Sequence, residues 1–587
     1  MCKFGRYGWA FLAWLGCWTG ALAATGAEVA DVVLYGGRIV AVDSTFRVAE
    51  ALAVRGERIL EVGTDAAVLE RAGPDTRRID LEGRTVLPGL IDTHSHPVSA
   101  SLYEFDHKVP DMQSIDDVLD YVRSRAEQLE EGEWIRINQV FITRLRERRF
   151  PTRDELDRAA PRHPVMFRTG PDAAVNSLAL ELSGIDEDFE ISDGQPGFLE
   201  RDPETGTLTG ILRSCTRLIR AQSPGRRPSD EDRYDHLKEL LAAYNAVGIT
   251  SVVDRAVSDA SAALYQQLRD RGDLTCRMFL TYSVNAQAAL EEIEARIEAA
   301  AQHPLRTYDN LLWLRGIKIF LDGGMLTGSA YMREPWGVSD IYSITDPEYR
   351  GVLFIEPDKL YQIARIALSN EMQLTAHTVG DGAVETLVQA YARVNEAFPV
   401  RPLRPAISHA NFVTPEAMDT MARLGIVADL QPAWLWHDGA TLKAHFGSER
   451  LAYFQPYRQF FERGVIVGGG SDHMQKIGRR RSINTYDPFL GMWTTLVRRP
   501  RWSEQPLHPD QAISREQALR LYTSQAAYLT FEEDEKGSLE PGKLADFIIL
   551  DRDYLTCPID EVKDIQVLST WLGGYPVYES RGIRSGE

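Results

Sequence analysis

The sequence contains little cysteine, which limits how the fold can be stabilised. Only five of the 587 residues are Cys, and two of these, Cys2 and Cys17, lie in an N-terminal apolar segment. The remaining Cys215, Cys276 and Cys557 are too few and too widely spaced to form a disulfide framework. They also do not form the cluster that a cysteine-built zinc site requires. The fold must therefore depend on a hydrophobic core, for which 44% hydrophobic residues are sufficient.

A surplus of positive charge is also absent. The formal net charge is -20, from 85 acidic and 65 basic residues. Proteins that bind nucleic acids need a basic surface to contact the phosphates, so the composition argues against a nucleic-acid partner. The acidic balance says little about the substrate, because net charge chiefly controls solubility. We expect a small-molecule substrate, and the sequence leaves a homo-oligomer open.

The one apolar run near the N-terminus is short for a membrane span, which needs about 20 apolar residues. Lys3 and Arg6 precede the run from Gly8 to Leu22, and Ala21-Leu22-Ala23 offers a cleavage site of small residues. This is the pattern of a secretory signal peptide. We predict that residues 1–23 are removed on export to the periplasm or the outside of the cell, leaving no membrane span. An uncleaved N-terminal anchor is the alternative.

Both ends of the remaining chain are rich in short strand patterns. Between residues 31 and 63, apolar runs are joined by Gly36-Gly37 and by Arg55-Gly56-Glu57, which are typical of hairpin turns. Near the C-terminus, Asp546–Leu550 and Ile565–Trp571 also have strand patterns. We predict that residues 24–87 and 520–587 form one small composite β-sandwich domain.

The middle of the chain alternates apolar strand-like runs with helical stretches. This alternation is typical of parallel βα units, and eight units predict a (β/α)8 barrel over residues 88–519. About 150 residues separate the first two strands, far more than one crossover needs. An insertion is therefore expected within residues 98–240, with strands of its own at Trp134–Val140 and Pro164–Arg168. The eight predicted barrel strands are Thr85–Ile91, Ile249–Val253, Arg277–Tyr282, Leu314–Leu321, Gln373–His377, Ala406–His409, Ile426–Leu430 and Val465–Gly469.

Two histidines follow the first predicted barrel strand, at positions 94 and 96. Residues two apart on an extended backbone point the same way, so the imidazoles of His94 and His96 can bind one metal ion. Barrels of this kind keep their chemistry at the carboxyl ends of the strands. His377 and His409 end the fifth and sixth predicted strands, and Asp472 follows the eighth. We predict that these five side chains meet at one barrel mouth.

Lys318 lies inside the apolar fourth strand, between Ile317 and Ile319. A buried and unpaired ammonium group is costly, and removal from water lowers the pKa of a lysine. We therefore expect Lys318 either to have a special partner, such as Asp322 or Asp472, or to have lost its charge.

These residues resemble the motifs of the amidohydrolase superfamily, and most closely those of its family-three branch, which includes N-substituted formamide deformylases. The resemblance extends from about Asp31 to Glu579. It rests on the combination of six segments, namely Pro88–His96, Lys318–Gly324, His377–Asp381, Ser408–Ala410, Gly470–Asp472 and Gly537–Asp546.

The resemblance implies a composite β domain beside a (β/α)8 barrel and one or two divalent metals, usually zinc. In relatives with two metals, a lysine at the position of Lys318 is carbamylated and bridges them, which would explain a buried lysine without its charge. The implied metal ligands in this chain are His94, His96, Lys318, His377, His409 and Asp472.

The sequence departs from the family pattern at two places. Relatives often have a His a few residues before an Asn that matches Asn176, whereas this chain has Asp172-Ala173-Ala174-Val175 there. After Asp472, relatives usually have a small residue and then Pro, whereas this chain has His473-Met474-Gln475. The resemblance therefore does not identify the substrate.

The resemblance implies hydrolysis of a non-peptide C–N bond in a small amide by metal-activated water, which is the leading hypothesis. A metal ion lowers the pKa of bound water from about 15.7 to near 7. Asp472 would accept the proton of the water and pass it to the leaving group. His409 or His377 would hold metal and help to polarise the scissile carbonyl.

Three further residues are candidates for contacts with the substrate. Asp322 is either such a residue or a turn residue before Gly323-Gly324. Trp434 and Trp436 follow the seventh predicted strand. They line an apolar pocket in one interpretation and belong to the general packing in the other.

Other chemistries fit the same residues. The site can support the reactions of an esterase, a lactonase or a deaminase. A secreted, non-catalytic binding protein on a former enzyme scaffold is a different class of interpretation. The complete ligand set argues against it, since a site without catalysis has no reason to keep every ligand.

Export can be tested directly on protein purified from its native host. N-terminal sequencing should give a chain that begins near Ala24, because the small residues at positions 21–23 match a signal-peptidase site. Soluble cytoplasmic protein that still begins with Met1 would rule the signal peptide out.

Overall fold

The computed structural model describes residues 28–138, 140–170, 172–194, 197–222, 227–342 and 344–580. The predicted signal peptide lies outside these ranges, as do Cys2 and Cys17. Among the helices of the described ranges, none combines the length and the apolar character that crossing a membrane requires.

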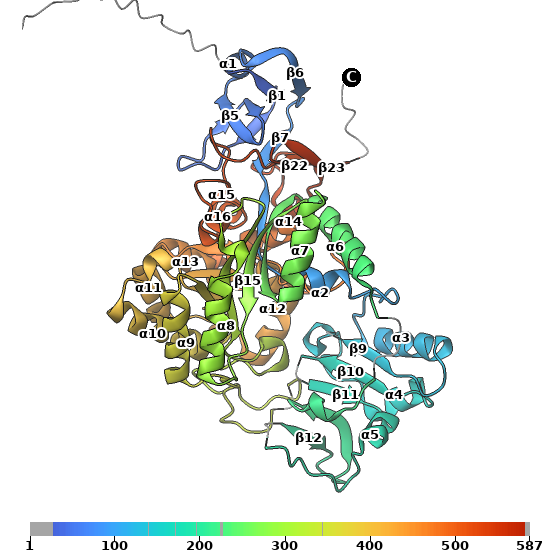
Figure 1. Ribbon diagram of the computed structural model, residues 1–587. Coiled ribbons are helices and arrows are strands. Elements are labelled where there is room, and N and C mark those ends of the chain that lie inside the picture. Colours follow the sequence, from blue (N-terminus) through green and yellow to red (C-terminus); the bar gives the residue numbers. More distant parts are fainter. Residues whose placement is uncertain are drawn as a thin grey trace, which may run out of the picture.

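Eight parallel strands form the centre of the molecule (Figure 1). Neighbouring strands pair in the order β8, β14, β15, β16, β17, β18, β19 and β20. The ring closes between its first and last strands, where the Asp472 N–H donates to the His94 carbonyl at 2.7 Å. This confirms the predicted (β/α)8 barrel. The strands are β8 (Leu90–Ser95), β14 (Ile249–Val257), β15 (Arg277–Ser283), β16 (Leu312–Phe320), β17 (Gln373–Thr378), β18 (Ala406–His409), β19 (Val427–Leu430) and β20 (Val467–Gly469).

Helices that lie between the strands in sequence, or follow the last of them, surround the barrel. Several begin at residues that satisfy the first free N–H groups, as the Ser229 side chain does in a capping box with Asp232. The helices are α6 (Asp230–Asn245), α7 (Asp259–Asp270), α8 (Leu290–Ala301), α9 (Pro357–Ser369), α10 (Asp381–Ala397), α11 (Pro415–Leu424), α12 (Pro432–Phe446), α13 (Tyr457–Arg463), α14 (Pro488–Val497), α15 (Arg515–Leu521) and α16 (Ser524–Leu529).

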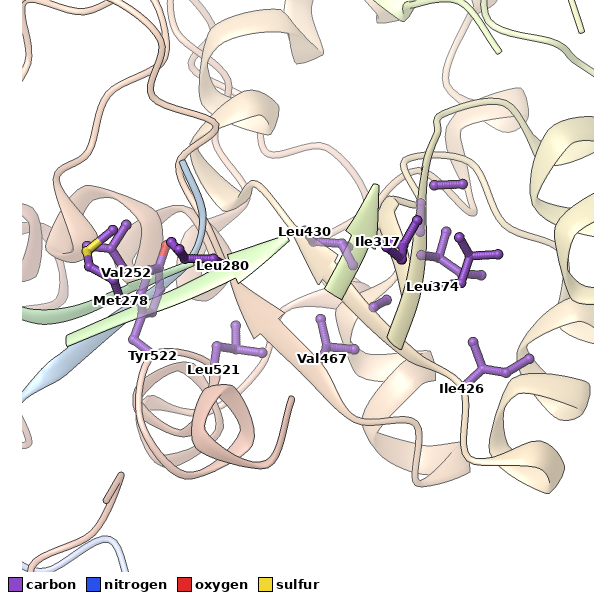
Figure 2. Close-up of a cluster of buried hydrophobic side chains, with 14 of the residues drawn as sticks. Val252, Met278, Leu280, Ile317, Leu374, Ile426, Leu430, Val467, Leu521 and Tyr522 are labelled. Atoms are coloured by element: carbon purple, nitrogen blue, oxygen red, sulfur yellow. The ribbon is translucent and has the colours of Figure 1, made fainter. Parts of the chain in front are cut away.

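The main hydrophobic core lies between these helices and the strands. Figure 2 shows part of it, including Leu280, Ile317, Leu374, Leu430 and Val467. Each of these side chains is fully buried. Burial of apolar surface on this scale is the main force that holds the layers together.

The side chains of β16 show how the barrel interior differs from this core. Successive residues of a strand point to opposite faces. Ile317 and Ile319 belong to the core that packs against the helices, so Lys318 points into the barrel. The adjacent residue of β17 is Thr375, which is also buried. The inside of the barrel is therefore partly polar at this level.

The predicted first strand, Thr85–Ile91, is in fact two strands. β7 (Thr85–Pro88) belongs to a six-stranded sheet outside the barrel, and β8 begins at Leu90. The chain passes between the sheets at Gly89, where a Cβ would lie 2.2 Å from the Thr250 hydroxyl oxygen. Only glycine allows so close an approach. The run Thr85–Ile91 is continuous in sequence, but its two halves belong to different sheets.

Two sheets at the chain ends form a small β layer, at the top of Figure 1. A shared core joins Leu34 and Leu52 to Phe547, Ile549 and Trp571. Both chain ends therefore contribute to one unit, as predicted. The six-stranded sheet has β23 (Tyr575–Glu579), β22 (Val567–Leu572), β21 (Phe547–Leu550), β7, β2 (Arg38–Val40) and β3 (Val48–Ala49); the other has β5 (Arg58–Gly63), β4 (Ala51–Arg55), β1 (Ala30–Tyr35) and β6 (Ala72–Asp80), beside α1 (Asp65–Leu69).

The insertion after β8 forms a separate lobe beside the barrel (Figure 1). It begins after α2 (Pro97–Ser101) and contains both strands predicted for it, as β9 and β10. Its elements are α3 (Ile115–Gln128), β9 (Ile135–Asn138), α4 (Arg153–Ala159), β10 (Val165–Thr169), β11 (Asp172–Val175), α5 (Ser177–Ser183), β12 (Phe198–Arg201) and β13 (Leu208–Arg213). The five strands form one sheet.

Candidate metal centre

His94, His96 and Asp472 meet at the carboxyl end of the barrel. One ligand atom from each lies within 4.8 Å of the other two. Asp472 Oδ1 is 3.3 Å from His94 Nε2 and 3.2 Å from His96 Nε2. Two imidazole nitrogens and a carboxylate oxygen are ligands that zinc and other divalent metals accept in catalytic sites.

The ring of His94 is oriented by a buried carboxylate. His94 Nδ1 lies 2.6 Å from Asp429 Oδ1. Asp429 is in β19 and is fully buried. Because a carboxylate accepts hydrogen bonds, Nδ1 carries the proton and the lone pair of Nε2 remains free. That free nitrogen is the one that faces Asp472.

His377 and His409 lie beside this group. The His409 ring centroid is 4.7 Å from that of His94 and 4.5 Å from that of His377. His409 Nδ1 contacts Gln431 Oε1 at 2.8 Å, which leaves its Nε2 available. Burial and the nearby Lys318 lower the pKa of His377 to about 3. Burial also lowers the pKa of His409 well below its usual value. Both imidazoles are therefore neutral, and the neutral form is the one that binds metal.

Lys318 lies in the same interior with no conventional partner. Its side chain is 1% exposed, and its Nζ forms no hydrogen bond with any residue that the structure describes. Hydrogen-bonded pairing with Asp322 or Asp472, one of the two alternatives for this lysine, is therefore not found. Burial lowers the pKa of Lys318 to about 7, although the charges of Asp429 and Asp472 oppose this shift. A substantial fraction of the amine is thus neutral near pH 7.

Asp322 organises the loop that follows β16. Its carboxylate oxygens accept the backbone N–H groups of Val379 and Gly380 at 2.9 Å and of Tyr331 at 3.0 Å. Burial raises the pKa of Asp322 to about 7. Since both oxygens are already engaged with the backbone, the geometry favours the role of a turn residue over a contact with substrate.

A cavity of about 490 Å³ opens next to these residues. Trp434 lines it and stacks on His409, with ring centroids 5.1 Å apart. Trp436 lines a different cavity, together with Arg501. Both tryptophans lie in α12, where residues two apart point about 200° from each other around the helix axis. The two side chains therefore point to different sides of α12 and line different cavities.

Two residues with important contacts at the site were not predicted. The Asn484 side chain donates from Nδ2 to the Asp472 carbonyl oxygen at 2.8 Å and to Asp472 Oδ2 at 3.1 Å. Asn484 lies in an irregular segment, and no local pattern marks it. Asp429 could have been predicted from the sequence. It is a charged residue inside the apolar run Val427–Leu430, just as Lys318 is a charged residue inside an apolar strand.

The chain is similar to known proteins over most of its length. Residues 77–578 match the profile of the amidohydrolase family. The N-substituted formamide deformylase of Arthrobacter pascens is 30% identical over 565 residues, which cover 94% of this chain and 99% of that protein.

Two solved structures share the fold at low sequence identity. An uncharacterised metal-dependent hydrolase from Pyrococcus horikoshii OT3 has a TM-score of 0.65 at 22% identity, covering 90% of this chain and 99% of that one. An adenosine deaminase from Xanthomonas campestris with bound zinc has a TM-score of 0.51 at 16% identity, and 95% of each chain is covered.

The contact between Asn484 and Asp472 yields a prediction that requires no substrate. Asn484→Ala should weaken zinc binding about 10–100-fold, as is typical when a residue that orients a ligand is removed. Competition with a chromophoric chelator measures this affinity. Asn285→Ala, at an exposed position, is the matched control and should bind as the wild type does. Equal affinities of the two variants would show that Asn484 does not support the site.

Proposed function

The chain belongs to the amidohydrolase family, and from this premise we propose that it hydrolyses a non-peptide C–N bond of a small amide with a bound divalent metal. The observation that carries the proposal is the meeting of His94, His96 and Asp472 beside a cavity of about 490 Å³. A volume in this range suits a small-molecule substrate.

The residues fit a divalent cation on chemical grounds. His94 Nε2, His96 Nε2 and Asp472 Oδ1 would hold one ion, and zinc accepts this combination of nitrogen and oxygen ligands. His377 and His409 add neutral imidazoles at the edge of the group, so the site has ligands for a second ion. When bound, the metal supplies a nucleophile at neutral pH by lowering the pKa of a water molecule.

Asp472 is the group that moves the proton. Asn484 holds its Oδ2 at 3.1 Å, so Oδ1 faces the imidazoles of His94 and His96. In the proposed reaction the Asp472 carboxylate accepts the proton of the attacking water and then donates it to the nitrogen of the leaving amine. The neutral His409 lies beside His94, and its free Nε2 would hold metal. Because Nδ1 is engaged by Gln431 Oε1, His409 would act on the scissile carbonyl only through the metal.

The walls of the cavity favour an apolar substituent on the substrate. Phe141, Met325, Leu326, Val379 and Trp434 are among its lining residues and all are buried. Burial of an apolar group against such walls contributes about 25 cal/mol per Å². Uncharged N-formyl and N-acyl amines with an apolar group are therefore the substrates that we expect to be cleaved best.

Hydrolysis should depend strictly on metal. Purified protein should contain one to two divalent ions per chain by elemental analysis, and exhaustive chelation should abolish activity until zinc is restored. Activity is best measured on a panel of N-formyl and N-acyl amines, with the corresponding esters as controls for reaction class. Faster cleavage of the esters would make the protein an esterase. Full amide hydrolysis without detectable metal would refute the mechanism.

We also propose that Lys318 carries a carbamate when the site holds two metals. The support is its buried Nζ, which has no hydrogen-bond partner in the described part of the chain, together with a pKa of about 7. The neutral amine is the form that reacts with carbon dioxide: the nitrogen bonds to the carbon and releases one proton. The product is an anion with two oxygens, which resolves the burial of an unpaired ammonium group.

Substitution of Lys318 tests the carbamate. Lys318→Ala should lose one metal and most activity, and short carboxylic acids should restore part of both because they replace the missing oxygens. Lys318→Arg should not be rescued, since a guanidinium stays charged and cannot form a carbamate. If Lys318→Ala keeps the metal content of the wild type, the bridging carbamate is ruled out, and a single ion bound by the histidines and Asp472 replaces it as the proposal.

A further inference from the structure

A second cavity, of about 130 Å³, lies between the insertion, α12 and the segment that follows Asp472. It shares only Phe141 with the cavity at the metal centre. Part of its wall comes from Gln475 to Ile483, directly after the point where the sequence departs from the family pattern. Its volume admits a ligand of only a few non-hydrogen atoms, since one water molecule occupies about 30 Å³ in the liquid.

Two buried polar atoms that lack partners belong to side chains lining the cavity. His437 Nε2 and Ser482 Oγ form no hydrogen bond within the residues that the structure describes. The side chains are 8% and 3% exposed, respectively. Buried polar groups are almost always hydrogen-bonded. Two such atoms on side chains that line one small cavity favour a polar ligand there.

The cavity wall is rich in basic side chains, although most of them are paired with carboxylates. Burial and the neighbouring Arg144 and Arg501 lower the pKa of His437, so the charge comes from the five lysine and arginine side chains of the wall. Four of the five are neutralised by carboxylates at 2.7–3.1 Å, in the pairs Arg144–Asp438, Lys476–Asp111, Arg480–Asp487 and Arg481–Glu104.

Arg501 is the basic group of this wall without a carboxylate. Its guanidinium forms no ion pair with a described residue, and it lies over the rings of Trp436 and Trp502, at 5.3 and 4.5 Å. Its backbone N–H donates to the Trp436 carbonyl oxygen at 2.6 Å, which ties the residue to α12. An arginine stays charged in proteins, so one positive charge remains uncompensated.

We propose that this cavity binds a small oxyanion, either a carboxylate or a phosphate group, at a site separate from the substrate cavity. Arg501 supplies the opposite charge, and neutral His437 and Ser482 donate hydrogen bonds from Nε2 and Oγ. The uncompensated charge of Arg501 disfavours a cation, and the three donor groups match the several lone pairs of an oxyanion. The site adjoins the metal centre, because Arg144 also donates to Asn484 Oδ1 at 3.0 Å.

Calorimetric titration of the metal-loaded protein with sodium phosphate and with sodium acetate tests the site, at constant ionic strength held by sodium chloride. The wild type should bind at least one of the two anions saturably, and the tighter one identifies the class of ligand. Arg501→Gln should weaken this binding at least about tenfold, since a charged hydrogen bond is lost. Ser482→Ala should weaken it less, by a few fold.

Arg499→Gln is the matched control. Arg499 is two residues away and pairs with Asp560 at 2.8 Å, outside the cavity. This variant should bind the anions as the wild type does, and thermal melting of all variants checks that they fold. If Arg501→Gln does not fold, weaker binding by Ser482→Ala decides the question. Equal binding by every variant, or no saturable binding by the wild type, overturns the proposal. Neither result depends on the hydrolytic reaction.

Discussion

The arrangement of the metal centre depends on how charge is buried inside the barrel. A buried ionised group is tolerated only when partners replace the water it has lost. Asp429 has such partners: Ser408 Oγ donates to its carboxylate at 3.0 Å, and Arg255 Nη2 lies at 3.0 Å. Its other oxygen is engaged by His94 Nδ1. The hydrogen bond between His94 Nδ1 and Asp429 therefore has two effects. It gives the buried carboxylate a partner, and it turns His94 Nε2 toward the candidate metal site.

Backbone conformation adds a second constraint at the same place. His409 and Asp472 have φ angles of 79° and 54°, in the left-handed region that costs non-glycine residues about 1–3 kcal/mol. Asp472 is held there because its N–H donates to the His94 carbonyl oxygen at the point where the barrel closes. The same backbone hydrogen bond thus closes the barrel and orients the Asp472 carboxylate.

The sequence was informative wherever a regular pattern or an improbable residue marked a feature. Eight apolar runs predicted the barrel, and Lys318 was conspicuous because a charge interrupts an apolar strand. The prediction of one strand over Thr85–Ile91 was wrong, because two strands of different sheets follow each other directly across Gly89. Trp436 misled because helical geometry separates it from Trp434. Asn484 could not be predicted, since its contact with Asp472 depends on the path of an irregular segment.

The central claim is that His94, His96 and Asp472 hold a catalytic metal at the barrel mouth. The most direct measurement is anomalous X-ray scattering from crystals of the purified protein, with data collected above and below the zinc absorption edge. The account predicts a strong anomalous peak within bonding distance of His94 Nε2, His96 Nε2 and Asp472 Oδ1. Well-ordered side chains with no metal between them, in protein that hydrolyses its substrate, would contradict it.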